Sequence, residues 1–372
     1  MIQNDKMLDC MWQRYPQRQK RSSSVWWFYL LFPQDENGFS RKQAMFTLVS
    51  RVGKQVSIND TWHTGLRHPH QPNGHKAETL NLMSLGWIHD GQQLHDKIVC
   101  DPVVGTLQEG CVGGRQADTG YGGEILAMND KPYQVHNQFT GPRGQAIFDF
   151  WGNPAAVTLR PESLDIDTGF GDANVLYWGH GRFDGNFTTP DGRLHNWQGV
   201  GYFQRICLNI LPFPWKWIYA IFDDESIFSC FIPYLGPHLL RRGHWFFPNW
   251  LEQATFPMHT SGYFSRSPEH EQIPFDNIQV TPVLKRSGNP DFAISCANQQ
   301  GDTLQFRANS HCHKEIIMKR PIFTRRLTTH YHYNEYLFEI SDFQATLNGE
   351  TLDTQTLGKG VGNCEYTWGL GL

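Results

Sequence analysis

The sequence predicts an all-β protein, and three observations support this prediction. Helical periodicity is scarce along the 372 residues. Apolar and β-branched runs are instead bounded by turn residues at short intervals, a pattern typical of β-sandwiches and β-barrels. Aromatic residues make up 14% of the chain, which supplies much flat apolar surface to bury or to place around a ligand.

The turns follow one another along the chain and predict local antiparallel pairing. The first hairpin joins residues 22–32 to residues 43–51 through Asp35-Glu36-Asn37-Gly38, where Asn-Gly accepts positive φ at low cost. Three further turns between strands are expected at 190–193, 223–225 and 348–349, and the last strand runs through Glu365. Because each turn joins neighbouring strands directly, the sheets are expected to be antiparallel.

Three segments are expected to break this pattern. Residues 60–80, rich in His, Pro and Gly, predict a loop. The Gly-rich stretch 109–124 is interpreted as turns without a dinucleotide site, since no helix is suggested after it. Residues 235–275 predict a long excursion that contains the only helix suggested by the sequence, near 249–253.

Length and composition exclude several classes of protein. A chain of 372 residues favours two domains, which we place at 22–200 and 201–372 after an N-terminal tail over 1–21. The net charge of −4 gives no positive field for a nucleic acid. The eight cysteines form no C-x-x-C pair, and neither a signal peptide nor a transmembrane helix is evident. We therefore expect a cytoplasmic protein with reduced thiols, for which transient membrane contact and oligomeric state stay open.

Four segments, taken in order, resemble the AttH/CrtC lipocalin-like family. Trp26-Trp27-Phe28-Tyr29, with the turn and strand that follow, is similar to the family's opening hairpin. The stretch from Tyr177 through Gly201-Tyr202-Phe203-Gln204-Arg205 resembles the strand pair and central motif. Trp215-Lys216-Trp217 through Asp223-Asp224 resembles the next hairpin, and Gly358–Glu365 the closing strand. The family includes carotenoid 1,2-hydratases; tocopherol cyclase and lipocalin-like Diels–Alderases are more distant relatives in fold.

The resemblance implies two lipocalin-like antiparallel β-barrel or sandwich halves around an apolar ligand cavity, with few helices. It implies an enzyme that promotes cyclisation, hydration or isomerisation of a hydrophobic isoprenoid- or polyene-like substrate without a cofactor. One departure matters. Gln204-Arg205 stands where the family's central motif carries Asp-His, and if that Asp is the proton donor, hydratase chemistry does not carry over.

Candidate wall residues of such a cavity are Trp27, Tyr177, Trp215 and Trp217. Trp215 and Trp217 are two apart in a strand and therefore share a face. Their indole faces would stabilise a developing carbocation by about 0.5–2 kcal/mol each. The alternative is that these side chains only fill the core, because aromatic residues dominate protein interiors.

Candidate polar groups are Gln204, Arg205 and Glu365. A buried carboxyl group has a raised pKa, and the protonated acid can donate a proton to an alkene, a carbonyl or an ether oxygen. Gln204 could orient a carbonyl but is not a useful acid. An Arg–Glu pair or a solvent-facing Glu365 would be structural instead.

Two H-x-H pairs, His311/His313 and His330/His332, would bring four imidazoles together if adjacent strands carried them. No carboxylate is fixed by spacing to complete a metal site, and we expect no metal and no cofactor. Two other functions stay open beside the enzyme. One is a lipid or pigment carrier, which does not require a buried ionisable group. The other is a carbohydrate-binding β-sandwich, which predicts aromatic residues on an exposed face or groove.

Overall fold

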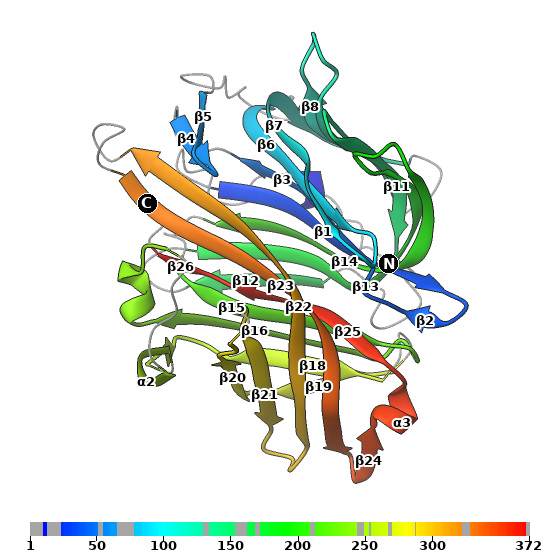
Figure 1. Cartoon of the computed structure of the whole chain (residues 1–372), viewed down its shortest axis with the longest axis vertical. Coiled ribbons are helices and arrows are strands. Elements are labelled where there is room, and N and C mark those ends of the chain that lie inside the picture. Colours follow the sequence, from blue (N-terminus) through cyan, green and yellow to red (C-terminus); the bar gives the residue numbers. More distant parts are fainter. Residues whose placement is uncertain are drawn as a thin grey trace. The chain divides into compact units, whose positions relative to one another are not determined.

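The structure is a computed structural model, and its elements are drawn in Figure 1. It describes residues 10–12, 24–50, 55–64, 78–128, 134–152, 162–167, 172–208, 213–243, 249–252, 254–266, 270–286, 288–321 and 328–369. The chain divides into two compact units: an N-terminal unit, Met1–Val56 and Trp62–Leu211, and a C-terminal unit, Ser57–Thr61 and Pro212–Leu372.

The described elements of the N-terminal unit are η1 (Cys10–Trp12), β1 (Ser24–Asp35), β2 (Gly38–Phe39), β3 (Gln43–Ser50), β6 (Glu78–His89), β7 (Leu94–Gln108), β8 (Cys111–Arg115), β9 (Gly122–Ala127), β10 (Gln134–Gly141), β11 (Gly144–Trp151), β12 (Glu162–Asp167), β13 (Asp172–Thr188) and β14 (Leu194–Leu208). Strands β4 (Gln55–Ile58) and β5 (Thr61–Thr64) each contain a boundary between the units. The chain enters the C-terminal unit after Val56 and returns to the N-terminal unit at Trp62.

The described elements of the C-terminal unit are β15 (Trp215–Phe222), β16 (Ile227–Leu235), η3 (Pro237–Leu240), α2 (Asn249–Glu252), β17 (Phe256–Pro257), β18 (Ser261–Ser265), β19 (Ile273–Phe275), β20 (Asn277–Val283), β21 (Asp291–Ala297), β22 (Thr303–Pro321), β23 (Thr328–Leu347), β24 (Glu350–Asp353), α3 (Thr354–Leu357), β25 (Gly360–Tyr366) and β26 (Trp368–Gly369).

The N-terminal unit is a closed antiparallel barrel. Its strands follow the order β11-β10-β9-β8-β7-β6-β3-β1-β14-β13, and β13 pairs back onto β11. Alternate residues of β1, among them Trp27 and Tyr29, belong to the core inside the barrel. The Tyr29 ring lies 5.4 Å from that of Phe148 and 5.3 Å from that of Phe150. Packed aromatic rings therefore fill this part of the interior.

The C-terminal unit is built on one large antiparallel sheet in the order β19-β18-β16-β15-β25-β23-β22-β21-β20. Ile218, Ala220 and Phe222 of β15 pack on one face of this sheet, with Tyr336 and Phe338 of β23. The intervening residues of β15, which include Trp217, point to the opposite face by strand alternation. The expected all-β class with two barrel or sandwich halves and few helices is confirmed.

The hairpin predictions are confirmed at their turns. Gly38 and Gly192 have φ of 87° and 79°, and Asn348 and Gly349 have φ of 51° and 81°. The turns at 36–37, 190–193, 223–225 and 348–349 all fall between consecutive strands. Strand β14 runs across the expected domain boundary at residue 200, whereas the compact units divide after Leu211. The tail over 1–21 and the two domain ranges stay predictions.

Three local predictions were wrong. A second short α-helix, α3, forms because the Asp353 carboxylate accepts hydrogen bonds from the backbone N–H groups of Gln355 and Thr356, both at 3.0 Å. The Gly-rich stretch contains strands β8 and β9 and not only turns. A Cβ on Gly113 would lie 2.1 Å from the Gly123 carbonyl oxygen, so glycine permits a close strand approach there. Residues 61–64, expected in a loop, form β5, and 65–77 lie outside the described residues.

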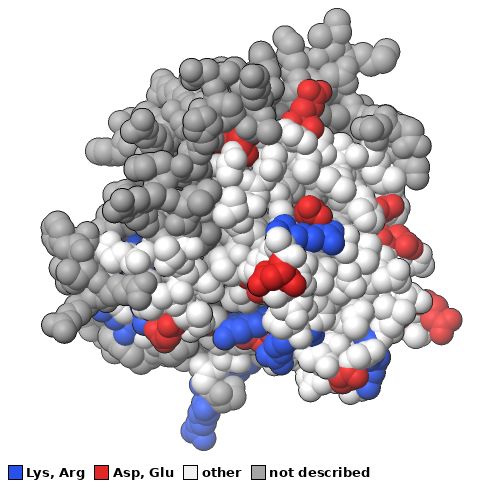
Figure 2. All heavy atoms as spheres, turned by 90° about the horizontal axis from the view of Figure 1, so that it is seen from above, with Lys and Arg blue, Asp and Glu red and all other residues white. Residues whose placement is uncertain are grey.

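In the face drawn in Figure 2, acidic and basic side chains of the described residues lie interspersed. The net charge of −4 is thus spread without a broad basic area on this face. Among the described residues, no helix is long and apolar enough to span a membrane.

Candidate active site

Strand β25 carries Glu365 between two neighbouring strands of the C-terminal sheet (Figure 1). Glu365 stands opposite Trp217 on β15 and opposite Glu335 on β23. Directly paired residues of antiparallel strands project from the same face. Two carboxyl groups and an indole therefore lie side by side on the face opposite the apolar core. Glu365 is 3% exposed and Glu335 is 0% exposed.

Two side chains hold the Glu365 carboxyl group. The Trp215 indole Nε1 donates to Oε2 at 2.6 Å, and the Tyr333 hydroxyl lies 2.5 Å from Oε1. The same hydroxyl lies 3.2 Å from Oε1 of Glu335. A phenol carries only one proton to donate. Both contacts are full hydrogen bonds when one of the two carboxyl groups is protonated and donates to Tyr333; with both groups ionised, the phenol shares its one proton between two acceptors.

The electrostatics agree with a protonated acid. Burial raises the pKa of Glu365 from 4.5 to about 7, against the hydrogen bonds from Tyr333 and Trp215, which lower it. Burial and the nearby Glu335 and Glu365 carboxyl groups raise the pKa of Tyr333 well above 10, so the phenol stays a donor. At neutral pH Glu365 is thus present in both acid and carboxylate forms.

Aromatic rings cluster around Trp215, which holds this acid, and three of the four rings are partly exposed. The Trp215 ring lies 5.7 Å from Tyr331, 6.2 Å from Tyr333 and 6.4 Å from Phe231, measured between centroids. Tyr331 is buried, whereas Trp215, Tyr333 and Phe231 are half-buried. A ligand that contacts these half-buried rings comes within reach of a carboxyl group that water barely reaches.

Asn363 adds a polar group to the same face, two positions before Glu365 on β25. Its side chain is 0% exposed, and among the described residues neither its amide nitrogen nor its amide oxygen has a hydrogen-bond partner. An unsatisfied buried polar group costs about 1–3 kcal/mol. A bound molecule with a polar group beside Glu365 would satisfy this amide.

The other predicted site residues lie in the N-terminal unit, where they form two separate sets. Trp27 pairs with Arg205 inside the barrel, and Tyr177 pairs with Gln204 on the other face. The Trp27 indole N–H donates to the Met11 carbonyl oxygen at 2.8 Å, so the polar group of this side chain is already hydrogen-bonded. Arg205 is 0% exposed and its guanidinium donates to the side-chain oxygen of Asn174.

Tyr177 and Gln204 belong to a half-buried polar and aromatic group. The Tyr202 hydroxyl donates to the Gln204 amide oxygen at 3.0 Å, and the Tyr202 ring stacks at 6.2 Å from Tyr177. The structure therefore joins Trp215, Trp217 and Glu365 in one cluster. Trp27, Tyr177, Gln204 and Arg205 belong to the other unit, and their roles in a site stay predictions.

Three of the four histidines of the H-x-H pairs, His313, His330 and His332, each contact a different side chain. His332 Nδ1 lies 2.7 Å from Glu315 Oε1, His313 Nε2 lies 2.9 Å from Asn334 Oδ1, and His330 Nε2 lies 3.1 Å from the Thr328 hydroxyl. Across the described part of the chain, no three His, Cys, Asp or Glu residues are arranged to hold a metal ion.

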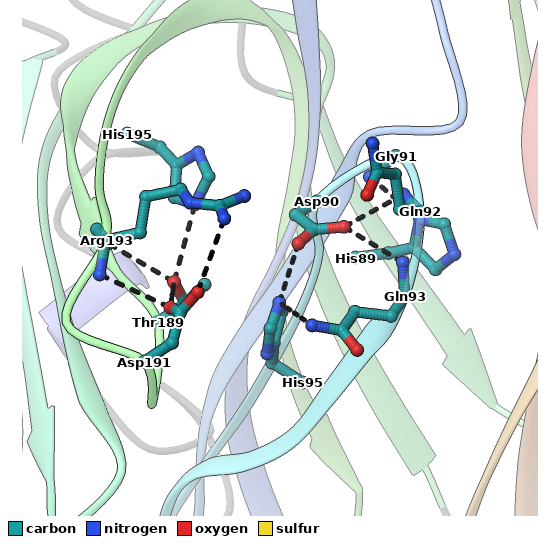
Figure 3. A network of polar contacts seen from close by, with 10 residues as sticks. All are labelled: His89, Asp90, Gly91, Gln92, Gln93, His95, Thr189, Asp191, Arg193 and His195. Carbon is teal, nitrogen blue, oxygen red and sulfur yellow. Dashed lines mark hydrogen bonds and ion pairs between the residues drawn. The ribbon is translucent and has the colours of Figure 1, made fainter.

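Two polar clusters lie at two turn regions of the N-terminal barrel (Figure 3). Asp90 accepts hydrogen bonds from the backbone N–H groups of Gln92 and Gln93 at 2.8 and 2.9 Å, and lies 2.8 Å from His95 Nε2. Burial raises the pKa of Asp90, but these bonds outweigh it and hold the pKa at about 2. Across from it, the Thr189 hydroxyl donates to Asp191 at 2.6 Å. Hydrogen bonds thus hold both turns in place.

Two pockets bounded by described residues both open on the outer surface of the N-terminal barrel, with volumes of about 450 and 210 Å³. Neither includes a predicted site residue. The enclosed apolar cavity expected from the sequence is not among these two, and it stays a prediction.

Sequence reasoning missed Tyr333, Glu335 and Asn363. Strand alternation in His330-Tyr331-His332-Tyr333-Asn334-Glu335 would have separated the histidines from a Tyr-Tyr-Glu face. Asn363 lies two residues before Glu365 and shares its face by the same rule. The pairing of β23 with β25, which brings these residues together, has no local signal.

No protein-family model and no curated protein matches the chain. Three solved structures are similar to it. An AttH protein from Nitrosomonas europaea has a TM-score of 0.47 at 11% identity over 96% of this chain and 97% of its own. CghA, a lipocalin-like Diels–Alderase, has 0.48 at 9% over 95% and 90%. Kievitone hydratase from Nectria haematococca has 0.43 at 11% over 94% and 90%.

The resemblance to the AttH/CrtC-like family that the sequence motifs indicate is confirmed, in that solved structures of this kind are similar to the chain. At 9–11% identity the similarity concerns the fold alone. Because every TM-score is below 0.5, the chemistry of the candidate site is argued from its own residues.

Proposed function

We propose that this protein is an acid catalyst for a hydrophobic, isoprenoid- or polyene-like substrate, and that Glu365 is the proton donor. The observation that carries the proposal is the Tyr333 hydroxyl, which contacts two buried carboxyl groups with a single proton to give. A carboxylic acid that stays protonated near neutral pH is suited to general acid catalysis.

The position of the exchangeable proton follows from the neighbouring charge. Lys314 on β22 is the direct cross-strand partner of Glu335, and both side chains are buried, at 7% and 0% exposure. A positive charge beside Glu335 favours its carboxylate form. Tyr333 then donates to Glu335, and Glu365 donates to Tyr333 or to a substrate.

The proton transfer balances within the site. The Glu365 carboxyl group gives its proton to a double bond, a carbonyl or an ether oxygen of the substrate. The resulting carboxylate keeps the hydrogen bond from Trp215, and the Tyr333 hydroxyl turns from Glu335 to donate its one proton to Glu365. The indole and phenol faces stabilise positive charge on the substrate by about 0.5–2 kcal/mol per ring. The Glu365 carboxylate then takes a proton back, either from the substrate cation, which completes cyclisation or isomerisation, or from a water molecule that has added to it, which completes hydration.

Asn363 is proposed to orient the substrate. Its amide offers two donors and an acceptor beside the acid, and no side chain of the described segments pairs with them. A substrate with one polar end would bind that end to Asn363 and place its apolar part against Trp215 and Phe231. The presence of a buried ionisable group favours this enzyme over a carrier, which does not require one.

The test is proton transfer from solvent to substrate. The protein is incubated in D₂O with geraniol, geranylgeraniol and lycopene, and with apolar molecules that co-purify with it, and deuterium incorporation is followed by mass spectrometry. We expect incorporation to fall at least about 100-fold in Glu365→Gln, consistent with loss of a general acid. The control Glu271→Gln changes an exposed carboxylate of the same unit and should react as wild type. Equal incorporation in Glu365→Gln would remove this residue from the mechanism, and binding without incorporation would indicate a carrier.

A further inference from the structure

The outer surface of the N-terminal barrel contains a polar groove that the proposed acid catalysis does not use. The two pockets on this surface, of about 450 and 210 Å³, share the lining residues Gln34, Asp184 and Gln198. Since they share a wall, the pockets form one groove across β1, β14 and β13. The Asp35–Lys42 ion pair, at 3.0 Å, lies at one end of it.

Strand pairing arranges the floor of the groove as a regular grid. Asp184 of β13 stands opposite Gln198 of β14, and Asn186 stands opposite Asn196. Residues two apart on a strand share a face about 7 Å apart, and neighbouring strands lie about 5 Å apart. Four exposed polar side chains therefore form two rows along the groove.

These side chains have hydrogen-bonding capacity to spare. Within the described residues, no hydrogen bond or ion pair engages the side chains of Gln34, Asp184, Asn186, Asn196 or Gln198. An exposed amide pair elsewhere behaves differently. On β22 and β23, Gln305 donates to the cross-strand Gln344 at 3.0 Å. The cross-strand pair Asn186/Asn196 is left open to a ligand, whereas Gln305/Gln344 is satisfied by its own bond.

An aromatic ring stands at the other end of the groove. Trp151 at the end of β11 is half-buried, lines the smaller pocket and pairs with Arg182 of β13. A partly exposed indole presents a flat apolar face beside the row of amides. The groove thus combines an aromatic platform with side chains that both donate and accept hydrogen bonds.

We infer that this groove binds a neutral oligosaccharide. Sugar hydroxyls donate and accept at every position, as amides do, so Asn186, Asn196 and Gln198 can pair with them in either sense. The carbon face of a sugar ring matches the Trp151 indole. A lipid tail would leave the amides unpaired, which costs binding energy. A polyanion would meet no net positive charge, because Asp35 and Asp184 offset Lys42 and Arg182 in the lining.

The inference is independent of the acid catalysis, because every groove residue lies in the N-terminal unit and Glu365 lies in the C-terminal unit. Binding is measured by isothermal titration calorimetry on the full chain. The probes are hexasaccharides of α-1,4-glucose, β-1,4-glucose, β-1,4-xylose, β-1,4-mannose and β-1,4-N-acetylglucosamine.

We expect at least one hexasaccharide to bind with Kd below about 1 mM. Asn186→Ala/Asn196→Ala should weaken this binding at least tenfold, and Trp151→Ala should do the same. Gln305→Ala/Gln344→Ala and Glu365→Gln should bind as wild type, with circular dichroism confirming that each variant is folded. No binding of any probe at about 10 mM, or equal affinity in the folded groove variants, would overturn the inference.

Discussion

Replacement of Glu365 by Gln is expected to change the pH dependence of stability by an amount that follows from the structure. Gln keeps the size of the side chain and can donate to the Tyr333 oxygen, but it does not ionise. The pKa of Glu365 is about 7 in the folded chain and 4.5 in the unfolded chain. Ionisation of this group therefore costs about 3 kcal/mol more in the folded state. Since Glu365 is 3% exposed, solvent screening removes little of this value.

The sign follows from proton binding. Between pH 4.5 and pH 7 the folded chain holds the Glu365 proton that the unfolded chain has lost. Stability from this group is therefore fully present below pH 4.5 and is lost as the pH rises through 7. The Gln variant lacks this loss. Between pH 5 and pH 9, the free energy of unfolding of Glu365→Gln should therefore rise by about 2–3 kcal/mol relative to that of wild type.

Urea unfolding, followed by tryptophan fluorescence at pH 5, 7 and 9, measures this difference. The exposed Glu271→Gln variant serves as the control, and its difference from wild type should stay constant over the same range. If the difference between Glu365→Gln and wild type also stays constant within about 0.5 kcal/mol, Glu365 ionises normally and the argument for a buried acid is refuted.

Three further outcomes are expected. Asn363→Leu removes a buried amide without a partner and should leave stability unchanged or raise it by up to about 2 kcal/mol in urea unfolding, while deuterium incorporation falls; a loss above about 2 kcal/mol would contradict the lack of a partner. Tyr333→Phe removes a hydrogen bond that lowers the pKa of Glu365, so an infrared titration of the carboxyl band should give a midpoint above 7, and an unchanged midpoint would argue against the contact. Asp90→Asn should lower the free energy of unfolding by about 2 kcal/mol at pH 7 and by little at pH 2. The hydrogen bonds that lower the pKa of Asp90, including that to His95, are lost as the pH falls through about 2. An equal loss of stability at both pH values would contradict this.

Local sequence was sufficient for the strands and their turns. Gly38, Asn348 and Gly349 adopt the positive φ that few other residues accept, and each lies at a turn that the sequence predicts. Alternation along a strand also placed Trp215 and Trp217 on one face. Both predictions depend on neighbours in the chain, which a sequence displays directly.

The chemistry of the site depends on pairing between distant strands. Glu365 is a candidate acid in the sequence but Glu335 is not, and the two become a pair only because β23 lies against β25. Burial then raises the pKa of Glu365, and the hydroxyl of Tyr333 joins the two carboxyl groups. The sequence by itself determined which segments become strands and which side chains share a face. The tertiary structure decided which acids meet and how little water reaches them, since both depend on contacts between residues far apart in the chain.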